Sequence, residues 1–117
     1  MAKNCVGTYE AYKARLLAMK PNVYLHGQKL DRSNGKQGAE RDLADWIVGG
    51  TYVMGKCYET ANDPAYADVC TATSHITGNT INRSTHIHHS KEDLLKKQLM
   101  TRLICHRVGG CMQRCMG

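Results

Sequence analysis

The sequence predicts a mainly α-helical fold, and three features of the chain support this prediction. Apolar residues recur at the three- and four-residue spacing of a helix in segments 7–20 and 40–61, and in the stretch that begins at Ser90. The intervening stretches are rich in Gly, Asn, Ser and Thr, a composition typical of loops. The 117 residues, none of them Phe, suffice for one domain or a piece of one, with an aliphatic core.

The composition limits the classes of partner. The net charge is +6, but the basic residues are spread along the chain and form no run interleaved with aromatics, so no nucleic-acid binding is predicted. A basic surface of this kind suits CoA phosphates, a partner domain or solvent. No apolar run approaches the ~18 residues of a membrane span, and the N-terminus lacks the apolar segment of a signal peptide, which together predict a cytoplasmic protein.

The first helix is expected over residues 7–20, and Pro21 ends it. A short extended segment, Val23 to Leu25, and a turn over 26–28 should follow. One side of the first helix carries Tyr9, Tyr12, Leu16 and Met19. In the extended segment, Tyr24 and Leu25 are expected to pack into the core.

Residues 31–39 are a loop by composition, and a second helix is expected over 40–61. Gly49, Gly50 and Gly55 weaken this helix unless another helix or a ligand approaches closely there. They do not form a phosphate-binding loop, because the Gly-Lys-Ser/Thr ending is absent. One face of this helix carries Leu43, Ile47, Gly50, Met54, Cys57 or Tyr58, and Ala61.

Asp63 and Pro64 should open a short helical turn. From 71 to 89 the periodicity disappears, which indicates irregular backbone with short extended pieces. A long irregular stretch in a compact domain is usually functional or pressed against another domain.

The last helix starts from a capping box, with Ser90 at the N-cap and Asp93 three residues on. Its expected core face is the four-residue repeat Leu95, Leu99 and Leu103. Glu92 and Lys96 are spaced to support the helix, and the surrounding basic residues form a solvated face: Lys91, Lys96, Lys97, Arg102, His106 and Arg107.

Cys111 and Cys115 follow Gly109 and Gly110 and form the main candidate metal site. On a helix, residues four apart share a face, so two thiolates would point at one centre and supply half a ligand set. The alternative is a pair of buried thiols. Cys105 is not expected to be a ligand, and the three earlier cysteines are expected to be structural: Cys5, Cys57 and Cys70. In the cytoplasm these thiols would stay reduced rather than form disulfides.

The segment His86-Ile87-His88-His89 is a second candidate metal site. Imidazoles suit zinc or copper, and with Cys111 and Cys115 they would complete a tetrahedral set in a stand-alone metal-binding module. Alternatively, these histidines only solvate a polar loop. No acid–base couple can be read from Glu59, Asp68 and Asp93, and no Ser-His or Cys-His nucleophile arrangement is evident.

The run from Asp63 to Leu103, followed by GGCMQRCMG, resembles the 4-hydroxyphenylacetate 3-hydroxylase superfamily of flavoproteins, and within it the 4-hydroxybutyryl-CoA dehydratase branch. The residues from Tyr9 to Leu16 and from Val23 to Gly27 resemble the opening of the same family. The context Cys111-Met112-Gln113-Arg114-Cys115 is typical of the dehydratase branch, whereas the monooxygenase branch lacks an iron–sulfur cluster. Thr77 to Arg83 also matches a family segment, while the section 31–53 matches least.

The resemblance implies a helical N-terminal domain of an acyl-CoA-dehydrogenase-like flavoprotein, in which Cys111 and Cys115 are two ligands of a [4Fe-4S] cluster. It implies dehydration of 4-hydroxybutyryl-CoA to crotonyl-CoA, with isomerisation of vinylacetyl-CoA, in a homotetrameric enzyme. In the implied radical mechanism FAD accepts an electron and the cluster acts as a Lewis acid toward the departing hydroxyl. The alternative within the superfamily is a flavin monooxygenase subunit, against which the cysteine pair argues.

The chain is much shorter than the members of this family. Residues 1–117 would therefore be a truncated N-terminal domain, inactive alone, that lacks a β-rich middle domain and a helical C-terminal domain. The resemblance implies that those missing parts hold most of the flavin site and the remaining His and Cys ligands of the cluster.

Overall fold

The computed structural model describes residues 1–19, 24–25, 27–29 and 44–110. These residues form a mainly α-helical structure with two small antiparallel hairpins, which confirms the predicted fold class at that level. The elements in chain order are α1 (Tyr9–Ala18), β1 (Tyr24–Leu25), β2 (Gln28–Lys29), α2 (Ala44–Asn62), α3 (Ala67–Cys70), β3 (Thr71–Thr73), β4 (Thr80–Asn82), the 3-10 turn η1 (Arg83–Thr85) and α4 (Lys91–Val108).

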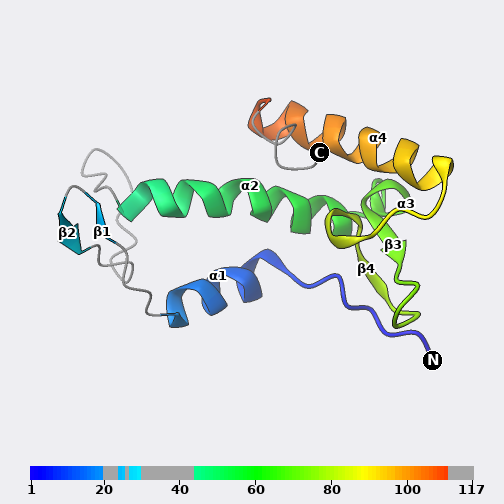
Figure 1. Cartoon of the computed structure of the whole chain (residues 1–117), viewed down its shortest axis with the longest axis horizontal. Helices are drawn as coiled ribbons and strands as arrows, with labels where there is room; N and C mark the ends of the chain where they lie inside the picture. The colour runs from blue at the N-terminus through cyan, green and yellow to red at the C-terminus, as the bar shows by residue number, and fades with distance from the viewer. Residues whose placement is uncertain (20–23, 26, 30–43, 111–117) are drawn as a thin grey trace.

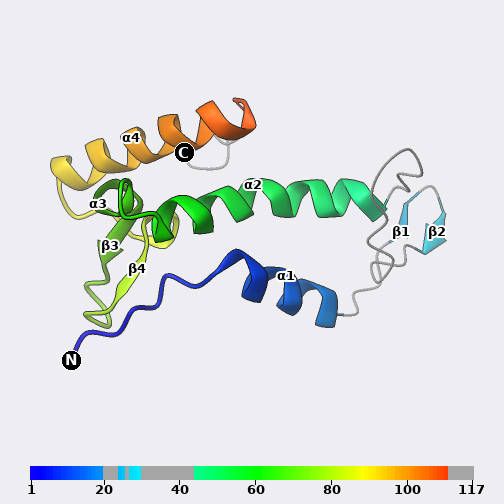
Figure 2. The same ribbon diagram turned by 180° about the vertical axis from the view of Figure 1, so that it is seen from behind.

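Helix α2 is the central element of the fold (Figure 1). It lies between α1 and α4, and the view from behind shows the same order (Figure 2). The β3–β4 hairpin lies beside the C-terminal end of α2. The N-terminal segment runs along β4, where the Cys5 N–H donates to the Thr80 carbonyl at 2.7 Å and the Thr80 N–H donates to the Lys3 carbonyl at 2.9 Å. The hairpin therefore joins the start of the chain to its second half.

Helix α1 forms as predicted, with Thr8 as its N-cap. The Thr8 hydroxyl accepts a hydrogen bond from the Ala11 N–H at 3.2 Å, which satisfies one of the free donors of the first turn. The predicted extended segment is found at Tyr24 and Leu25, and Gly27 lies in a turn with a positive φ of 77°. Gln28, predicted in that turn, instead begins strand β2, which pairs with β1 in an antiparallel hairpin. The prediction that Tyr24 packs in the core is wrong, because its side chain is 63% exposed on this two-residue strand. The Leu25 side chain and residues 30–43 lie outside the described residues.

Gly55 explains how α1 packs against α2. A Cβ built on Gly55 would lie 2.6 to 2.7 Å from ring atoms of Tyr9, so only glycine lets the two helices approach this closely. The two helices also meet through Tyr12 of α1 and Tyr58 of α2, whose ring centroids lie 5.3 Å apart. The prediction that a glycine in this helix marks a close approach is confirmed for Gly55.

We expect Gly55→Leu to destabilise the protein by about 1–3 kcal/mol, because the new side chain must displace the Tyr9 ring and push α1 away from α2. The matched control is Gly110→Ala, since no atom of the described residues lies within 4 Å of the added Cβ there. Urea unfolding followed by circular dichroism measures both variants. An unchanged midpoint for Gly55→Leu would contradict the packing described here.

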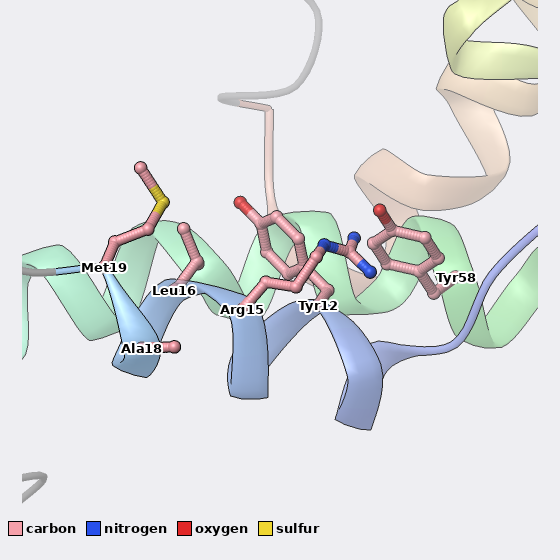
Figure 3. A pocket seen from close by; sticks show the side chains of 6 residues that line it. All are labelled: Tyr12, Arg15, Leu16, Ala18, Met19 and Tyr58. Atoms are coloured by element: carbon pink, nitrogen blue, oxygen red, sulfur yellow. The ribbon is translucent and has the colours of Figure 1, made fainter.

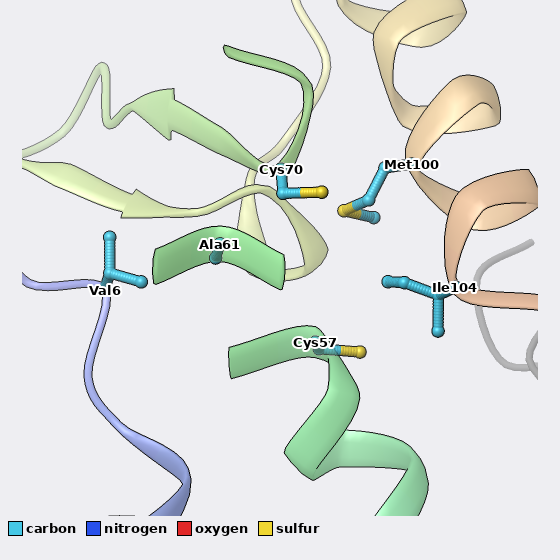
Figure 4. Packing of buried hydrophobic residues seen from close by; sticks show 6 residues of the cluster. All are labelled: Val6, Cys57, Ala61, Cys70, Met100 and Ile104. Atoms are coloured by element: carbon cyan, nitrogen blue, oxygen red, sulfur yellow. The ribbon is translucent and has the colours of Figure 1, made fainter. Parts of the chain in front are cut away.

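The core lies where α2, α3 and α4 meet (Figure 4). Its buried apolar residues are Val6, Cys57, Ala61, Cys70, Met100 and Ile104. Three of these six side chains contain sulfur. Burial raises the pKa of the Cys57 thiol to about 11 and also raises that of Cys70, so both thiols stay protonated at neutral pH. Cys57 and Cys70 are thus structural as predicted, whereas Cys5 is exposed and that part of the prediction is wrong.

The predicted core face of the last helix is wrong. Leu95 and Leu99 are 49% and 53% exposed, while Met100 and Ile104 are fully buried and Leu103 packs at the edge of the core. Asp93, Met100 and Ile104 are spaced by seven and four residues and so share one helix face. Asp93 on this face contacts Arg83 in η1 and His86, while Met100 and Ile104 pack in the core, so this face turns inward and the leucine row turns outward.

Both ends of α4 are capped. The Ser90 hydroxyl accepts a hydrogen bond from the Asp93 N–H at 3.1 Å, as predicted, but the Asp93 carboxylate accepts from the His89 N–H at 3.2 Å rather than from the Ser90 N–H. The helix ends at Val108, and Gly109 follows with a φ of 81°. Cys111 and Cys115 lie outside the described residues. No described helix is long and apolar enough to cross a membrane.

Candidate functional site

The densest polar network in the described structure surrounds Arg83, in the turn η1. Its side chain is 5% exposed and donates three hydrogen bonds: from Nε to the Val69 carbonyl at 2.7 Å, from Nη2 to the Thr71 carbonyl at 2.7 Å, and from Nη1 to Asp93 Oδ1 at 3.2 Å. A planar guanidinium can hold acceptors in several directions at once. Arg83 therefore ties the end of α3 and the start of β3 to the first turn of α4.

The local sequence places Arg83 here through its neighbour Asn82. The Asn82 side chain accepts hydrogen bonds from the Ser84 N–H at 3.0 Å and the Ser84 hydroxyl at 2.8 Å, which caps the turn η1. Its amide group also donates to the Cys57 carbonyl at 3.1 Å and so attaches β4 to α2. Asn82 and Arg83 are the last two residues of the segment from Thr77 that resembles the family. Both therefore have a structural role.

Asp93 is the centre of the network. Its Oδ2 lies 3.0 Å from His86 Nε2, and its two oxygens also accept from the His89 N–H and from Arg83. The hydrogen bond from His86, then the one from the His89 backbone and that from Arg83, lower the Asp93 pKa from 3.8 to about 2. The carboxylate is therefore ionised throughout the physiological range.

This pKa shift predicts how stability depends on pH. The pKa of Asp93 is lower in the folded state than in the unfolded chain, so the ionised carboxylate stabilises the fold. This contribution to the free energy of unfolding is fully present above about pH 4 and is lost as the pH falls through about 2. We expect the urea midpoint to decrease as the pH is lowered from 4 to 2, and Asp93→Asn to lose this pH-dependent component. Asp68→Asn, at an exposed surface pair, is the control. Equal pH profiles for Asp93→Asn and the unmodified protein would contradict the assignment.

Three histidine rings lie together at the edge of this network. His89 Nε2 and His75 Nδ1 are 2.8 Å apart, with ring centroids at 3.9 Å. The His86 ring lies 6.1 Å from that of His89 and 6.4 Å from that of His75, centroid to centroid. Because an ionised Asp93 only accepts hydrogen bonds, His86 carries a hydrogen on Nε2. Its Nδ1 is buried and has no hydrogen-bond partner among the described atoms.

The structure thus separates the histidines predicted as one cluster. His86 bonds to Asp93, His89 bonds to His75 from the β3–β4 turn, and His88 is half-buried with its Nδ1 unpartnered among the described atoms. In the described part of the chain, no three His, Cys, Asp or Glu side chains are placed to hold a metal ion together. The Cys111 and Cys115 thiols of the other predicted site lie outside the described residues.

Two further predictions about charged residues are corrected. His86 Nε2 lies 3.0 Å from Asp93 Oδ2, a contact that the sequence analysis did not predict. The signal for it was an Asp at the third position of a capped helix that follows a segment rich in His. Lys96, expected to pair with Glu92 on the same helix, instead donates to Asp68 at 3.0 Å. It therefore links α4 to α3.

A separate hollow of about 550 Å³ lies against α1 and α2 (Figure 3). Its walls are mostly apolar, and Arg15 supplies the one charged group among its lining residues: Tyr12, Arg15, Leu16, Ala18, Met19 and Tyr58. The mostly apolar lining given by these described residues suits an apolar segment.

Comparison with known proteins extends over nearly the whole chain. The family model for the N-terminal region of 4-hydroxyphenylacetate 3-hydroxylase matches residues 8–117. The chain belongs to this family. It is also 34% identical over 110 residues to the 4-hydroxybutyryl-CoA dehydratase/vinylacetyl-CoA-Δ-isomerase of Clostridium aminobutyricum. The alignment covers 94% of this chain and 21% of that protein.

The resemblance seen in the sequence is therefore confirmed, and it is a resemblance to the N-terminal region. The chain spans about a fifth of the length of the dehydratase that it matches. The matched region includes the network of Arg83, His86 and Asp93 as well as Cys111 and Cys115.

Proposed function

We propose that the 117 residues are the N-terminal helical domain of an enzyme that dehydrates 4-hydroxybutyryl-CoA to crotonyl-CoA and isomerises vinylacetyl-CoA. The observation that carries this proposal is the 34% identity to a dehydratase over 94% of the chain. The motif Cys111-Met112-Gln113-Arg114-Cys115 lies within the matched region and favours the dehydratase branch over the flavin monooxygenases.

In this proposal Cys111 and Cys115 are two ligands of a [4Fe-4S] cluster. Their thiol chemistry fits, since cysteine thiolates are the usual protein ligands of such clusters, and the other ligands and most of an FAD site come from later domains of an acyl-CoA-dehydrogenase-like chain. When bound, the cluster would supply a Lewis acid and the flavin a one-electron acceptor. The complete enzyme would act in the cytoplasm as a homotetramer.

The described residues would position this site rather than react. Arg83 and His86 hold Asp93 in the first turn of α4, and Lys96 attaches the second turn to α3. Met100 and Ile104 fix the rest of the helix on the core, up to its end at Val108, three residues before Cys111. A rigid helix of this kind limits where the cysteine ligands can lie.

The test is to express the complete reading frame that contains these residues under anaerobic conditions. We expect conversion of 4-hydroxybutyryl-CoA to crotonyl-CoA by a protein that carries FAD and about four iron and four sulfide per chain. Zinc without labile sulfide would instead support the stand-alone metal-binding module. Hydroxylation of a phenolic acid by an iron-free flavoprotein would support the monooxygenase branch, and either result overturns the proposal.

A further inference from the structure

The outer face of α4 carries an apolar row that the described elements leave half exposed. Leu95 and Leu99 are 49% and 53% exposed, and Leu103 continues the row to the edge of the core. Residues four apart lie on one face of a helix, so the three leucines form a continuous stripe. In both views α4 lies at the edge of the described structure, with α2 and α3 on its inner side (Figure 1, Figure 2). A row of exposed leucines at such an edge is typical of a contact surface.

The charges beside this row are mostly positive. Lys91, Arg102 and His106 each lie three or four residues from a leucine of the row, and Glu92 is the one acidic residue at the exposed positions of α4. No described carboxylate forms an ion pair with Lys91 or Arg102. Because cations beside an apolar stripe favour carboxylates at the matching positions of a partner, this face suits an amphipathic helix with acidic flanks.

Two other occupants fit this face less well. In a symmetric contact with a second copy the face meets itself, which brings the basic residues of both chains together with a single Glu92 on each side. A membrane surface favours a helix with a wide apolar face and large aromatic residues. Helix α4 presents one row of leucines instead, and its opposite face is held in the core by Met100 and Ile104.

A later part of the polypeptide is a source for such a helix. The alignment with the dehydratase covers 21% of that protein, and the proposed function places further domains after residue 117. Helix α4 ends at Val108, close in sequence to those domains. A segment tethered to α4 within one chain has a high effective concentration there, so even a narrow apolar row can hold it.

We propose that the row of Leu95, Leu99 and Leu103 docks an amphipathic helix with acidic flanks from a later domain of the same polypeptide. This inference rests on the proposed function in one respect, the presence of later domains. Docking would cover the second face of α4 and hold this helix between the described residues and the remainder of the chain.

The first test measures the accessibility of the row in the complete protein, purified anaerobically. Leu99→Cys places a thiol in the row, and because Leu99 is half exposed among the described residues, the change leaves their fold intact. We expect a maleimide, located by mass spectrometry, to label this thiol at least ~100-fold more slowly in the native protein than in urea. Leu95→Cys is the second variant and should behave in the same way. Labelling of either native variant as fast as in urea would overturn the proposal.

The second test examines the acidic flanks of the occupant. In the Leu99→Cys protein, Arg102→Glu should speed labelling at least ~10-fold, because it places a carboxylate against the proposed acidic residues. Lys3→Glu, at an exposed position of the N-terminal segment, is the matched control for the change in net charge and should leave the rate unchanged. Equal rates with and without Arg102→Glu would rule out an acidic partner.

A carbodiimide, which couples a lysine amine to a carboxylate, identifies the occupant. With Arg102→Lys in place, we expect Lys91 and the new amine at position 102 to be joined to Asp or Glu residues beyond position 117 of the same chain. Cross-links between two chains would show a second copy, and binding to anionic vesicles that Arg102→Glu abolishes would show a membrane surface; either result overturns the proposal. None of these readouts depends on catalysis, so crotonyl-CoA formation reports separately on the proposed function.

Discussion

Replacing Cys111 or Cys115 by serine in the complete enzyme is expected to abolish dehydration of 4-hydroxybutyryl-CoA. A serine hydroxyl is a much poorer ligand of iron than a thiolate, so the cluster should be lost or unstable. Because the proposed chemistry needs a Lewis acid at the departing hydroxyl, activity should fall below detection rather than by a small factor. The measurement is crotonyl-CoA formation together with iron, sulfide and FAD content of anaerobically purified protein.

The control for this experiment is Cys105→Ser. Cys105 lies six residues before Cys111, is half-buried on α4, and is not a predicted ligand. It should keep the iron content and most of the activity. If Cys105→Ser lost the cluster while Cys111→Ser kept it, the assignment of ligands would be wrong. If all three variants remained active, the proposed function of the cysteine pair would fail.

Arg83→Lys is expected to be the most destabilising of the conservative substitutions in the described structure. Lysine keeps the positive charge but has one nitrogen, which cannot reach Asp93 and the carbonyls of Val69 and Thr71 together. At least one part-buried acceptor would be left without a donor, at a cost of about 1–3 kcal/mol. Urea unfolding followed by circular dichroism measures this loss.

The matched control for Arg83→Lys is Arg102→Lys, at an exposed position of α4. It should change the stability by less than about 0.5 kcal/mol. Equal midpoints for the two variants would show that the buried network contributes little. If Arg83→Lys lowers the stability but keeps the helix content of the folded protein, the effect is localised to the junction between η1 and α4.

The sequence predicted most helices well because their signals are local. Ser90 is the N-cap that the sequence predicted, and the apolar spacing of each helix and its cap act within a few turns of the chain. The choice between two apolar rows of α4 could not be made this way. Leu99 and Met100 are neighbours of similar size, and Met100 faces inward against a core that includes Cys57 and Cys70, which lie far away in the sequence.

The candidate site was harder to predict for the same reason. Composition indicated that the histidines before α4 were special, but their partners are set by the fold. His89 meets His75 because the β3–β4 hairpin brings residue 75 back toward the start of α4, a pairing across fourteen residues. His86 meets Asp93 only once the Ser90 cap has fixed the first turn of that helix. The cysteine motif was recognised through its local context, which needs no tertiary structure.

The sulfur-containing core also gives the protein a built-in reporter of its own unfolding. Cys57 and Cys70 are 1% and 0% exposed, and their raised pKa values keep them in the unreactive thiol form, whereas Cys5 is open to reagents. An alkylating agent should modify Cys5 at once and reach the two core thiols only when α2, α3 and α4 separate. The rate at which mass spectrometry detects label at Cys57 and Cys70 would thus measure the opening of this helical layer in the intact enzyme, without any introduced probe.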